Sequence, residues 1–463
     1  MIAWFIHIAF AIASIVFCAI APAGFDSHLC QTIAACYCVQ TLLYFLFNGK
    51  KNFVGFEFFF CIAFFFANFA YPLFYYPDHE NWMFFFYPWN RAVITRATAI
   101  AYLGYTFFML GITRWVKMDR KEPIKVEFSI SMNQYLILFI LTVASFALYV
   151  YFGGWAAMRA VYNGSGSLRD VGIYSYIYVI FTLCIYLMAI FVFHLRQAQW
   201  WFYLLTMGVC ILLILATGSR TVVLAIGLIL IVGWNNNVRR FRVWEILIVT
   251  LIGVFSLWLI MQTRKEGNNS VMAIIHSMKP SEFVDIFADL TINGMNLYIL
   301  VDYGMKHTAD LFNGMLIDLA TPIPGMAKYI VAWTGRPYET LSAQEMSTYI
   351  MLGENSSWGM GCNMIGDAFR AGKYIGVALS MFLIGSFVKA SYYRSRTNIY
   401  WYAVYYLLVS YAVFYVRGPI LFPLRVLCWT LLLLWGVRSL TTFDWNKLFG
   451  LKQPDSSDKN EPS

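Results

Sequence analysis

Four arginines stand at positions from which a guanidinium group could bind phosphate. They are Arg220 in a Gly-Ser-Arg turn between two apolar runs, Arg264 directly after an apolar run, Arg336 before a proline, and Arg417 at the end of another apolar run. Arginine binds phosphate oxygens through two parallel hydrogen bonds and stays charged in a low dielectric. We expect all four at the outer lipid–water boundary of a membrane, where converging guanidinium groups would suit a lipid diphosphate headgroup.

The same arginines also have a structural interpretation, in which each side chain extends to lipid phosphates or caps a helix end. For a single arginine, the sequence favours neither interpretation over the other. For Arg220 and Arg264 taken together, the sequence favours a functional role.

Asp367 and Arg370 are three residues apart, so on a helix they share one face. They could form a local ion pair that closes a loop, or Asp367 could act as a base for a sugar hydroxyl while Arg370 contacts phosphate. His276 and His307 belong to the same polar stretch, and either could act as a general base. A single loop histidine is more often a surface residue, so we prefer Asp367.

Glu57 and Arg96 stand within apolar runs, where a charge is costly unless it has a partner. The two runs are neighbours along the chain, so we expect these two side chains to pair with each other. We interpret such a pair as structural.

The elements that must position these residues surround one long polar stretch, residues 263–373. It contains Pro322-Ile323-Pro324 and Gly335-Arg336-Pro337, and it closes with a glycine-rich segment between Gly359 and Gly376. An amphipathic helix is expected at residues 281–290, lying against the membrane or packing on the spans. A membrane protein that places about a hundred residues outside the hydrocarbon only once has usually placed its site there.

The composition is that of an integral membrane protein. Of the 463 residues, 60% are hydrophobic and only 12% are charged, whereas soluble domains carry about 25% charged residues. The net charge of +9 comes from short basic clusters between apolar runs, which report membrane orientation and predict no binding of nucleic acid. The apolar runs are about 17 to 24 residues long and do not alternate with a period of two, so they predict helices.

We expect about twelve membrane-spanning helices, nine within residues 1–262, the last of these at 245–262, and three within residues 374–438. With both termini in the cytoplasm, the cytoplasmic loops hold thirteen basic residues and the short outer loops hold five. Basic residues near span ends resist translocation, so this bias predicts cytoplasmic termini and a periplasmic loop at 263–373. Residues 439–463 are expected to form a disordered cytoplasmic tail.

Nine cysteines are present, and eight of them lie within the apolar runs. None stands in the pattern with histidine that a metal site needs, and no disulfide framework is implied. We therefore expect neither a metal nor another cofactor.

Taken in order, these motifs resemble the bacterial O-antigen and repeat-unit polymerases of the Wzy type. The resemblance rests on the turn that ends at Arg220, the long outer loop late in the chain, Pro322-Ile323-Pro324, Arg336-Pro337, and the glycine-rich segment with Ile365-Gly366-Asp367. It covers roughly residues 200–380 in motif order, and the whole chain in length and number of spans. Family members often carry glutamate at the position of Asp367 and an aromatic-rich stretch around the position of Arg370, so this chain departs from the family pattern there.

The resemblance implies a metal-independent, inverting glycosyltransferase of the bacterial inner membrane. It would move a growing glycan from undecaprenyl diphosphate to the non-reducing end of a fresh lipid-linked repeat unit, with a chain-length-regulating co-polymerase as a further partner. Asp367, or else His307, would take the proton of the acceptor hydroxyl. The arginines that would neutralise the diphosphate are Arg220, Arg264, Arg417, Arg336 and Arg370. The aromatic residues that could line the glycan are Trp333, Tyr338 and Trp358.

Two other functions stay open on the sequence alone. A ligase that transfers the finished glycan to the lipid A core would share the arginines and a loop histidine, and His307 follows Arg264 by 43 residues. A flippase for lipid-linked oligosaccharides would need charges spread through many spans, whereas nearly all expected buried positions here are apolar. The Pro-x-Pro and Arg-Pro motifs favour the polymerase.

Overall fold

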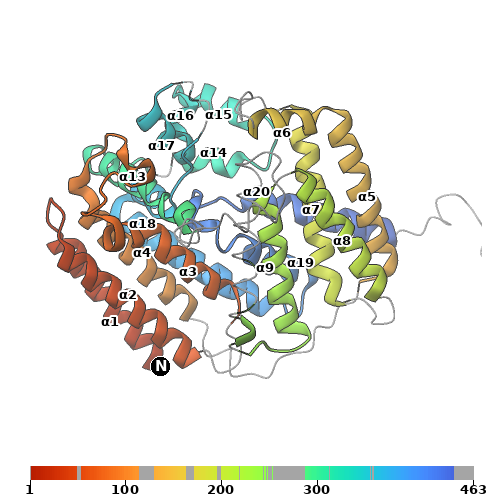
Figure 1. Ribbon diagram of the computed structural model, residues 1–463, viewed down its shortest axis with the longest axis horizontal. Coiled ribbons are helices and arrows are strands. Elements are labelled where there is room, and N and C mark those ends of the chain that lie inside the picture. Colours follow the sequence, from red (N-terminus) through yellow and green to blue (C-terminus); the bar gives the residue numbers. More distant parts are fainter. Residues whose placement is uncertain are drawn as a thin grey trace, which may run out of the picture.

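The computed structural model is built from helices and describes most of the chain. The described residues are 2–48, 54–113, 130–162, 172–194, 200–217, 219–242, 287–311, 313–354 and 359–442, with the short pieces 244–246, 248, 253 and 356. Within these residues the secondary structure is helical and contains no strand (Figure 1). This confirms the expectation of an all-α polytopic membrane protein.

Among the described residues, six helices are long and apolar enough to cross a membrane. They are α2 (Ser27–Asn48), α4 (Ile94–Thr113), α5 (Met132–Tyr151), α7 (Ile173–Phe191), α18 (Met364–Arg394) and α20 (Leu424–Thr442). Four more are apolar but shorter, namely α1 (Ile2–Ile20), α3 (Phe56–Asn68), α8 (Trp200–Thr217) and α9 (Arg220–Asn237). The span expected at 245–262 lies largely outside the described residues, as does the tail beyond residue 442.

The helices form two groups that meet at α18. Helices α1 to α4 lie with α13 and α18 on one side of the molecule in Figure 1, and α5, α7, α8 and α9 lie on the other. Helix α18 packs on α4 and α13 in the first group. In the second group it packs on α19 (Ile399–Tyr411), which in turn packs on α9 and α20.

Glycine allows α4 and α18 to approach each other closely. A Cβ atom at Gly111 of α4 would lie 2.3 Å from the carbonyl oxygen of Phe382, and a Cβ at Gly385 of α18 would lie 2.3 Å from the carbonyl oxygen of Phe108. Such backbone contact through small residues is typical of helix pairs in membranes. It anchors α18 against α4, whose residues are almost all buried.

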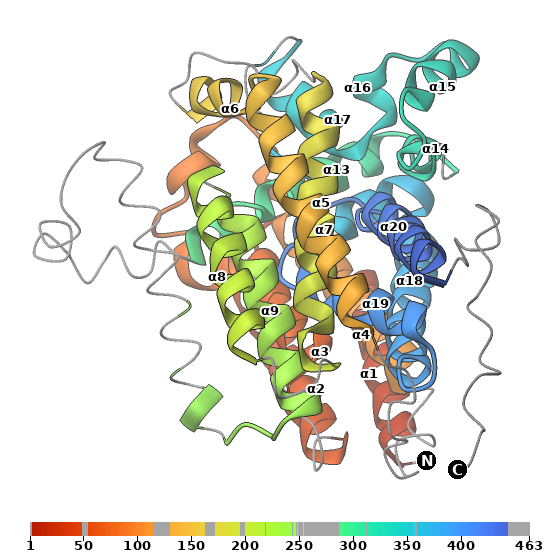
Figure 2. The same ribbon diagram turned by 90° about the vertical axis from the view of Figure 1, so that its right-hand side faces the viewer.

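In its described part, the long polar stretch forms several short helices after residue 293. They are α13 (Gly294–Lys306), α14 (Met315–Ala320), α15 (Met326–Thr334), α16 (Tyr338–Leu341) and α17 (Ala343–Leu352). In Figure 2, α14 to α17 gather with α6 (Gly154–Tyr162) at one end of the molecule, and the N-terminus lies at the opposite end. The helix expected at 281–290 is described only from residue 287, where Phe287 stacks on Phe66 of α3 with ring centroids 4.2 Å apart.

Glu57 pairs with Lys389 of α18, so the expected pair between Glu57 and Arg96 is wrong. Oε1 of Glu57 lies 3.4 Å from Nζ of Lys389, and the two side chains are only 12% and 9% exposed. Arg96 instead donates from Nε to the carbonyl oxygen of Ala21 at 3.3 Å. The reason is that Glu57 and Arg96 stand in the first turns of α3 and α4, and successive helices that cross a bundle in alternate directions begin at opposite ends.

Candidate active site

Helix α18 begins inside the protein at an asparagine cap. The side-chain oxygen of Asn363 accepts hydrogen bonds from the backbone N–H groups of Ile365 at 3.0 Å and Gly366 at 3.4 Å. Its amide nitrogen donates to Oδ1 of Asn68, at the end of α3, at 3.0 Å. The cap pairs N–H groups that would otherwise lack an acceptor, and it fixes the first turn of α18, on which Asp367 stands.

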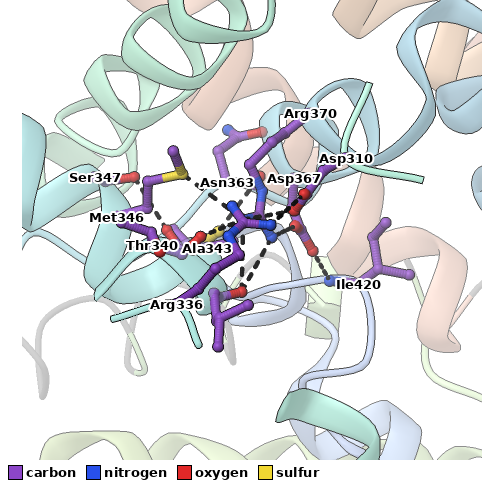
Figure 3. Close-up of polar contacts among 12 residues, drawn as sticks. Asp310, Arg336, Thr340, Ala343, Met346, Ser347, Asn363, Asp367, Arg370 and Ile420 are labelled. Atoms are coloured by element: carbon purple, nitrogen blue, oxygen red, sulfur yellow. Dashed lines mark hydrogen bonds and ion pairs between the residues drawn. The ribbon is translucent and has the colours of Figure 1, made fainter. Parts of the chain in front are cut away.

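Asp367 and Arg370 form the ion pair that their spacing predicts. Nη2 of Arg370 lies 3.2 Å from Oδ1 of Asp367, and the two side chains are 2% and 0% exposed. The second carboxylate oxygen of Asp367 accepts a hydrogen bond from the backbone N–H of Ile420 at 3.0 Å. Both oxygens of Asp367 are therefore occupied (Figure 3).

The guanidinium group of Arg370 also contacts the short polar helices. Its Nη1 lies 3.5 Å from Oδ2 of Asp310. Nη1 also donates to the carbonyl oxygens of Thr340 at 3.3 Å and Leu341 at 3.5 Å, and it lies 3.7 Å from the sulfur of Met346. Nε of Arg370 has no acceptor among the residues that the structure describes. A buried guanidinium group is stable only with partners of this kind.

A second ion pair extends these contacts toward the surface. Nη1 of Arg336 lies 2.8 Å from Oδ1 of Asp310, and the two side chains are 38% and 14% exposed. Asp310 thus bridges Arg336 and Arg370, and Arg370 bridges Asp310 and Asp367 (Figure 3). We call these four side chains the ion-pair cluster. Charges of opposite sign alternate along it from the surface to the core, which makes their burial tolerable.

Helix α14 packs its first turn against the same guanidinium group. A Cβ atom at Gly314, the residue before α14, would lie 1.9 Å from Nη2 of Arg370. Asp318 lies four residues later, one turn along the same face of the helix. Asp318 is 8% exposed, and no donor in the described part of the chain forms a hydrogen bond with its carboxylate.

The surroundings of Asp318 favour its neutral form. Burial is the main cause and raises the pKa of Asp318 to about 7 from an ordinary value of 3.8. The negative charge of Asp367 raises this pKa further, and the positive charge of Arg370 opposes the increase. A carboxyl group in this range exchanges its proton near neutral pH, which suits a general acid or base. Burial also raises the pKa of the Cys362 thiol well above its ordinary value, so this cysteine stays protonated.

Arg417 reaches the site through its backbone. Its carbonyl oxygen accepts a hydrogen bond from the N–H of Cys362 at 3.4 Å, directly before the cap of α18. The chain then continues to Ile420, whose N–H binds Asp367. The Arg417-Gly418-Pro419 motif therefore lies beside the start of α18, and the Arg417 side chain is half-buried.

His307 lies apart from the ion-pair cluster, at the C-terminal end of α13. It is exposed, its ring stacks on Tyr303 with centroids 4.0 Å apart, and its Nδ1 lies 2.9 Å from the carbonyl oxygen of Tyr303. The carbonyl oxygen of His307 accepts a hydrogen bond from Lys373, where the backbone of α18 is broken and φ is +55°. Among the described residues, no ring contact of His307 is with the ion-pair cluster.

Three of the predicted site residues lie together in the structure. Arg370 contacts Asp367 directly, and Asp310 bridges Arg370 and Arg336. Arg220 is the first residue of α9, and its side chain lies outside the described part of the structure, as does all of Arg264. The placement of these two arginines relative to the cluster therefore stays a prediction.

Asp310 and Asp318 were not singled out by the sequence. Asp310 stands in a polar loop and meets Arg336 across 26 residues, so no local pattern marks it. Asp318 did carry a signal, because it interrupts the apolar segment Met315-Leu316-Ile317-Asp318-Leu319-Ala320. A carboxylate within such a segment is usually buried for a functional or structural reason.

Comparison of the sequence with known protein families finds a match over most of the chain. The family model described as O-antigen polysaccharide polymerase Wzy matches residues 1–442. A search of curated proteins and a search of solved structures found no match. The matched range contains the ion-pair cluster, Asp318 and all of the described helices.

Proposed function

Because the chain belongs to the O-antigen polysaccharide polymerase Wzy family, we propose that it polymerises oligosaccharide repeat units carried on undecaprenyl diphosphate. It transfers the growing glycan from one lipid carrier to the non-reducing end of a new lipid-linked unit, at the periplasmic face of the inner membrane. Both termini lie in the cytoplasm, and helices α14 to α17 lie on the periplasmic side. The observation that carries the proposal is the ion-pair cluster, which links a half-exposed arginine to a buried one at the start of α18.

The charges of the site indicate which residues must neutralise the leaving group. Arg336 and Arg370 carry two positive charges, whereas Asp310, Asp318 and Asp367 carry three negative charges when all are ionised. A departing diphosphate requires net positive surroundings, and these have to be in place before the bond breaks. The remaining positive charge comes from three further arginines, Arg220, Arg264 and Arg417. With them the transfer proceeds without a metal ion.

Arg336 and Arg370 contribute to this neutralisation in different ways. Arg336 is 38% exposed and uses one nitrogen for Asp310, so its other donors are available to phosphate oxygens. Arg370 is 2% exposed and is fixed by Asp367. It therefore contributes the electrostatic potential of its positive charge, and it holds the start of α14 in place. Two exposed aromatic residues near Arg336 in the sequence, Trp333 and Tyr338, line the glycan.

The reaction is a single displacement at the anomeric carbon. The acceptor hydroxyl attacks C1 of the growing glycan, the bond from C1 to the diphosphate oxygen breaks, and the configuration at C1 inverts. The diphosphate leaves on its lipid carrier, and a general base takes the hydroxyl proton.

The proposal is tested in cells in which this chain is the sole polymerase. Arg336→Ala, Arg220→Ala and Arg264→Ala should each reduce the surface glycan from a ladder to a single repeat unit at normal protein abundance. Arg91→Ala is the matched control and should give a full ladder, because Arg91 is 35% exposed and pairs with Glu80 at 3.0 Å, outside the cluster. Long chains that stay on the carrier would identify a ligase, and units trapped inside would identify a flippase. Either result overturns the proposal.

A purified system tests the chemistry of the transfer. With lipid-linked repeat units as substrate, polymer should form in the presence of EDTA, and the new linkage should have the opposite anomeric configuration to the sugar on the carrier. Polymerisation that stops with EDTA and returns with Mg²⁺ would rule out the metal-independent transfer. A retained configuration would rule out the single displacement.

A further inference from the structure

The proposed transfer needs a group that accepts the proton of the acceptor hydroxyl, and Asp367 is poorly placed for this role. Its Oδ1 accepts from Arg370 at 3.2 Å, its Oδ2 accepts from the N–H of Ile420 at 3.0 Å, and its side chain is fully buried. Contact with a sugar hydroxyl would break these bonds and leave the buried guanidinium group of Arg370 without its closest partner. Asp367 is therefore a positioning residue.

Asp310 forms ion pairs with both arginines of the ion-pair cluster. Its Oδ1 lies 2.8 Å from Nη1 of Arg336, and its Oδ2 lies 3.5 Å from Nη1 of Arg370. Each oxygen of this carboxylate thus faces a guanidinium group. Oδ2 accepts no hydrogen bond among the described residues, but a hydroxyl that bound it would compete with the ion pair to Arg370.

Asp318 differs from both of these aspartates in that no cation in the described part of the chain forms an ion pair with it. It lies on the face of α14 that begins at Gly314, whose Cα is packed against the guanidinium group of Arg370. Its carboxylate accepts no hydrogen bond within the described part of the chain. A carboxylate that is mostly buried and has no paired cation is costly to ionise, and such a cost is common where a group has a catalytic task.

We propose that Asp318 is the general base of the transfer, an inference that rests on the proposed function. As the acceptor oxygen bonds to C1 and the bond from C1 to the diphosphate breaks, the hydroxyl proton moves to a carboxylate oxygen of Asp318. The diphosphate leaves with the bonding electrons, and the neutral carboxyl of Asp318 later releases its proton to water. Asp318 loses its negative charge in the step in which the diphosphate gains one, so repulsion between the two does not increase.

The groups around Asp318 are consistent with this role. The titratable and charged groups that interact with it are Asp367 and Arg370 of α18, Tyr338 of α16, and Cys362. On α15, which packs on α14, the charged side chain is Lys328, whose Nζ lies 5.1 Å from the ring centroid of Tyr329. Burial raises the pKa of Asp318 to about 7, a value at which a base is both ionised and effective. Tyr338, whose phenol interacts electrostatically with Asp318, is 41% exposed.

The test measures chain extension by the purified full-length protein in nanodiscs, with lipid-linked repeat units as substrate. Asp318→Asn should lower the rate by about 10²- to 10⁴-fold, the contribution expected of a general base. Asp318→Glu should recover part of the rate, since it restores a carboxylate. The wild-type rate should rise with pH and level off above a pH of about 7, and this rise should be missing from the residual rate of Asp318→Asn.

Thermal stability separates a catalytic role from a structural one. Asp318→Asn should keep or raise the Tm, because the amide has the same shape and carries no buried charge. Asp367→Asn should lower the Tm, because it removes the charge that pairs with Arg370. A structural Asp318 would give the reverse result, with a lower Tm and a normal rate per folded molecule.

Each remaining outcome decides between the two proposals. A rate within threefold of wild type for Asp318→Asn overturns the role of Asp318 and leaves the polymerase intact. A wild-type protein that forms no polymer overturns the proposed function itself. If Asp318→Asn does not fold, the wild-type profile decides, because a rate that is independent of pH between about 5.5 and 8.5 overturns a base of this kind.

Discussion

Each charge in the ion-pair cluster has a partner of opposite sign, whereas Asp318 stands beside the cluster with no ion-pair partner among the described residues. Breaking a buried pair by removing one partner costs about 3–5 kcal/mol, so the pairs of Arg370 hold the start of α18 and the first turn of α14 together. Asp318 destabilises the same region when it is ionised. The site thus combines rigid paired charges with a single carboxylate that can change its charge.

Asp318 makes stability depend on pH in a predictable direction. Its pKa is about 7 in the folded protein and 3.8 ordinarily, so the folded state binds the proton more tightly than the unfolded state. The stability from this group is fully present below pH 3.8, and it is lost as the pH rises through about 7. We expect the Tm of the wild type to fall between about pH 5 and pH 8, and the fall to be smaller in Asp318→Asn. Thermal unfolding of both proteins in detergent at several pH values measures this difference, and equal slopes would contradict it.

The residues of the site could be predicted from the sequence only where their contacts are local. Asp367 and Arg370 are three apart on a helix, so their pairing follows from helix geometry in any fold. The sequence predicts Arg336 as a phosphate-binding residue, but its partner Asp310 is 26 residues away. That contact depends on how α13 to α16 fold back on α18, which no spacing encodes.

The effect of the α18 cap on the stability of the helix can be measured separately from its effect on the site that it positions. Asn363 caps α18, and Asn398 caps α19 by accepting from the N–H groups of Tyr400 at 2.8 Å and Trp401 at 3.4 Å. Loss of a cap costs about 1 kcal/mol, so Asn398→Ala should lower the Tm slightly, and Asn363→Ala should lower it further because it also removes the buried hydrogen bond to Asn68. Only Asn363→Ala should shorten the glycan ladder, because its cap orients the turn that carries Asp367.

Glycan ladders from cells that express each variant at equal abundance provide the measurement. Ladders of equal length in Asn363→Ala and Asn398→Ala would show that the direction of the first turn of α18 does not matter for polymerisation. A ladder shortened equally by both would instead indicate that reduced stability is the cause.

The start of α18 also shows where sequence patterns mislead. The glycine-rich segment indicated a loop up to residue 373, yet the chain is helical from Met364. Gly366 is needed for close packing, since a Cβ there would lie 2.8 Å from Cβ of Leu300 in α13. The helix does break at Gly372 and Lys373, next to the expected start of the span, where Lys373 has a φ of +55°. Glycines that permit close contact and glycines that permit turns look the same in a sequence.

For the whole molecule, composition predicts the fold class but not how the helices are arranged. Apolar runs of span length predict helices, because a lipid-exposed backbone must satisfy its hydrogen bonds internally. Such runs are apolar on all sides, so they do not mark which face meets which neighbour. The approach of α4 and α18 through Gly111 and Gly385, and the pairing of Glu57 with Lys389, are for this reason visible only in the structure.

Variants of the Glu57–Lys389 pair test whether a loss of stability in the C-terminal part of α18 affects the site at the start of the helix. Lys389→Met would leave Glu57 at 12% exposure without its cation, which should cost about 3–5 kcal/mol. The double variant Glu57→Gln/Lys389→Met removes both charges and should restore most of that stability. The pair lies in the C-terminal part of α18, whereas Asp367 and Arg370 of the ion-pair cluster lie in its first two turns. We therefore expect a lower Tm for Lys389→Met but an unchanged rate of chain extension per folded molecule. If the rate fell in the single variant and recovered in the double variant, the break at Gly372 and Lys373 would not isolate the site from the rest of the helix.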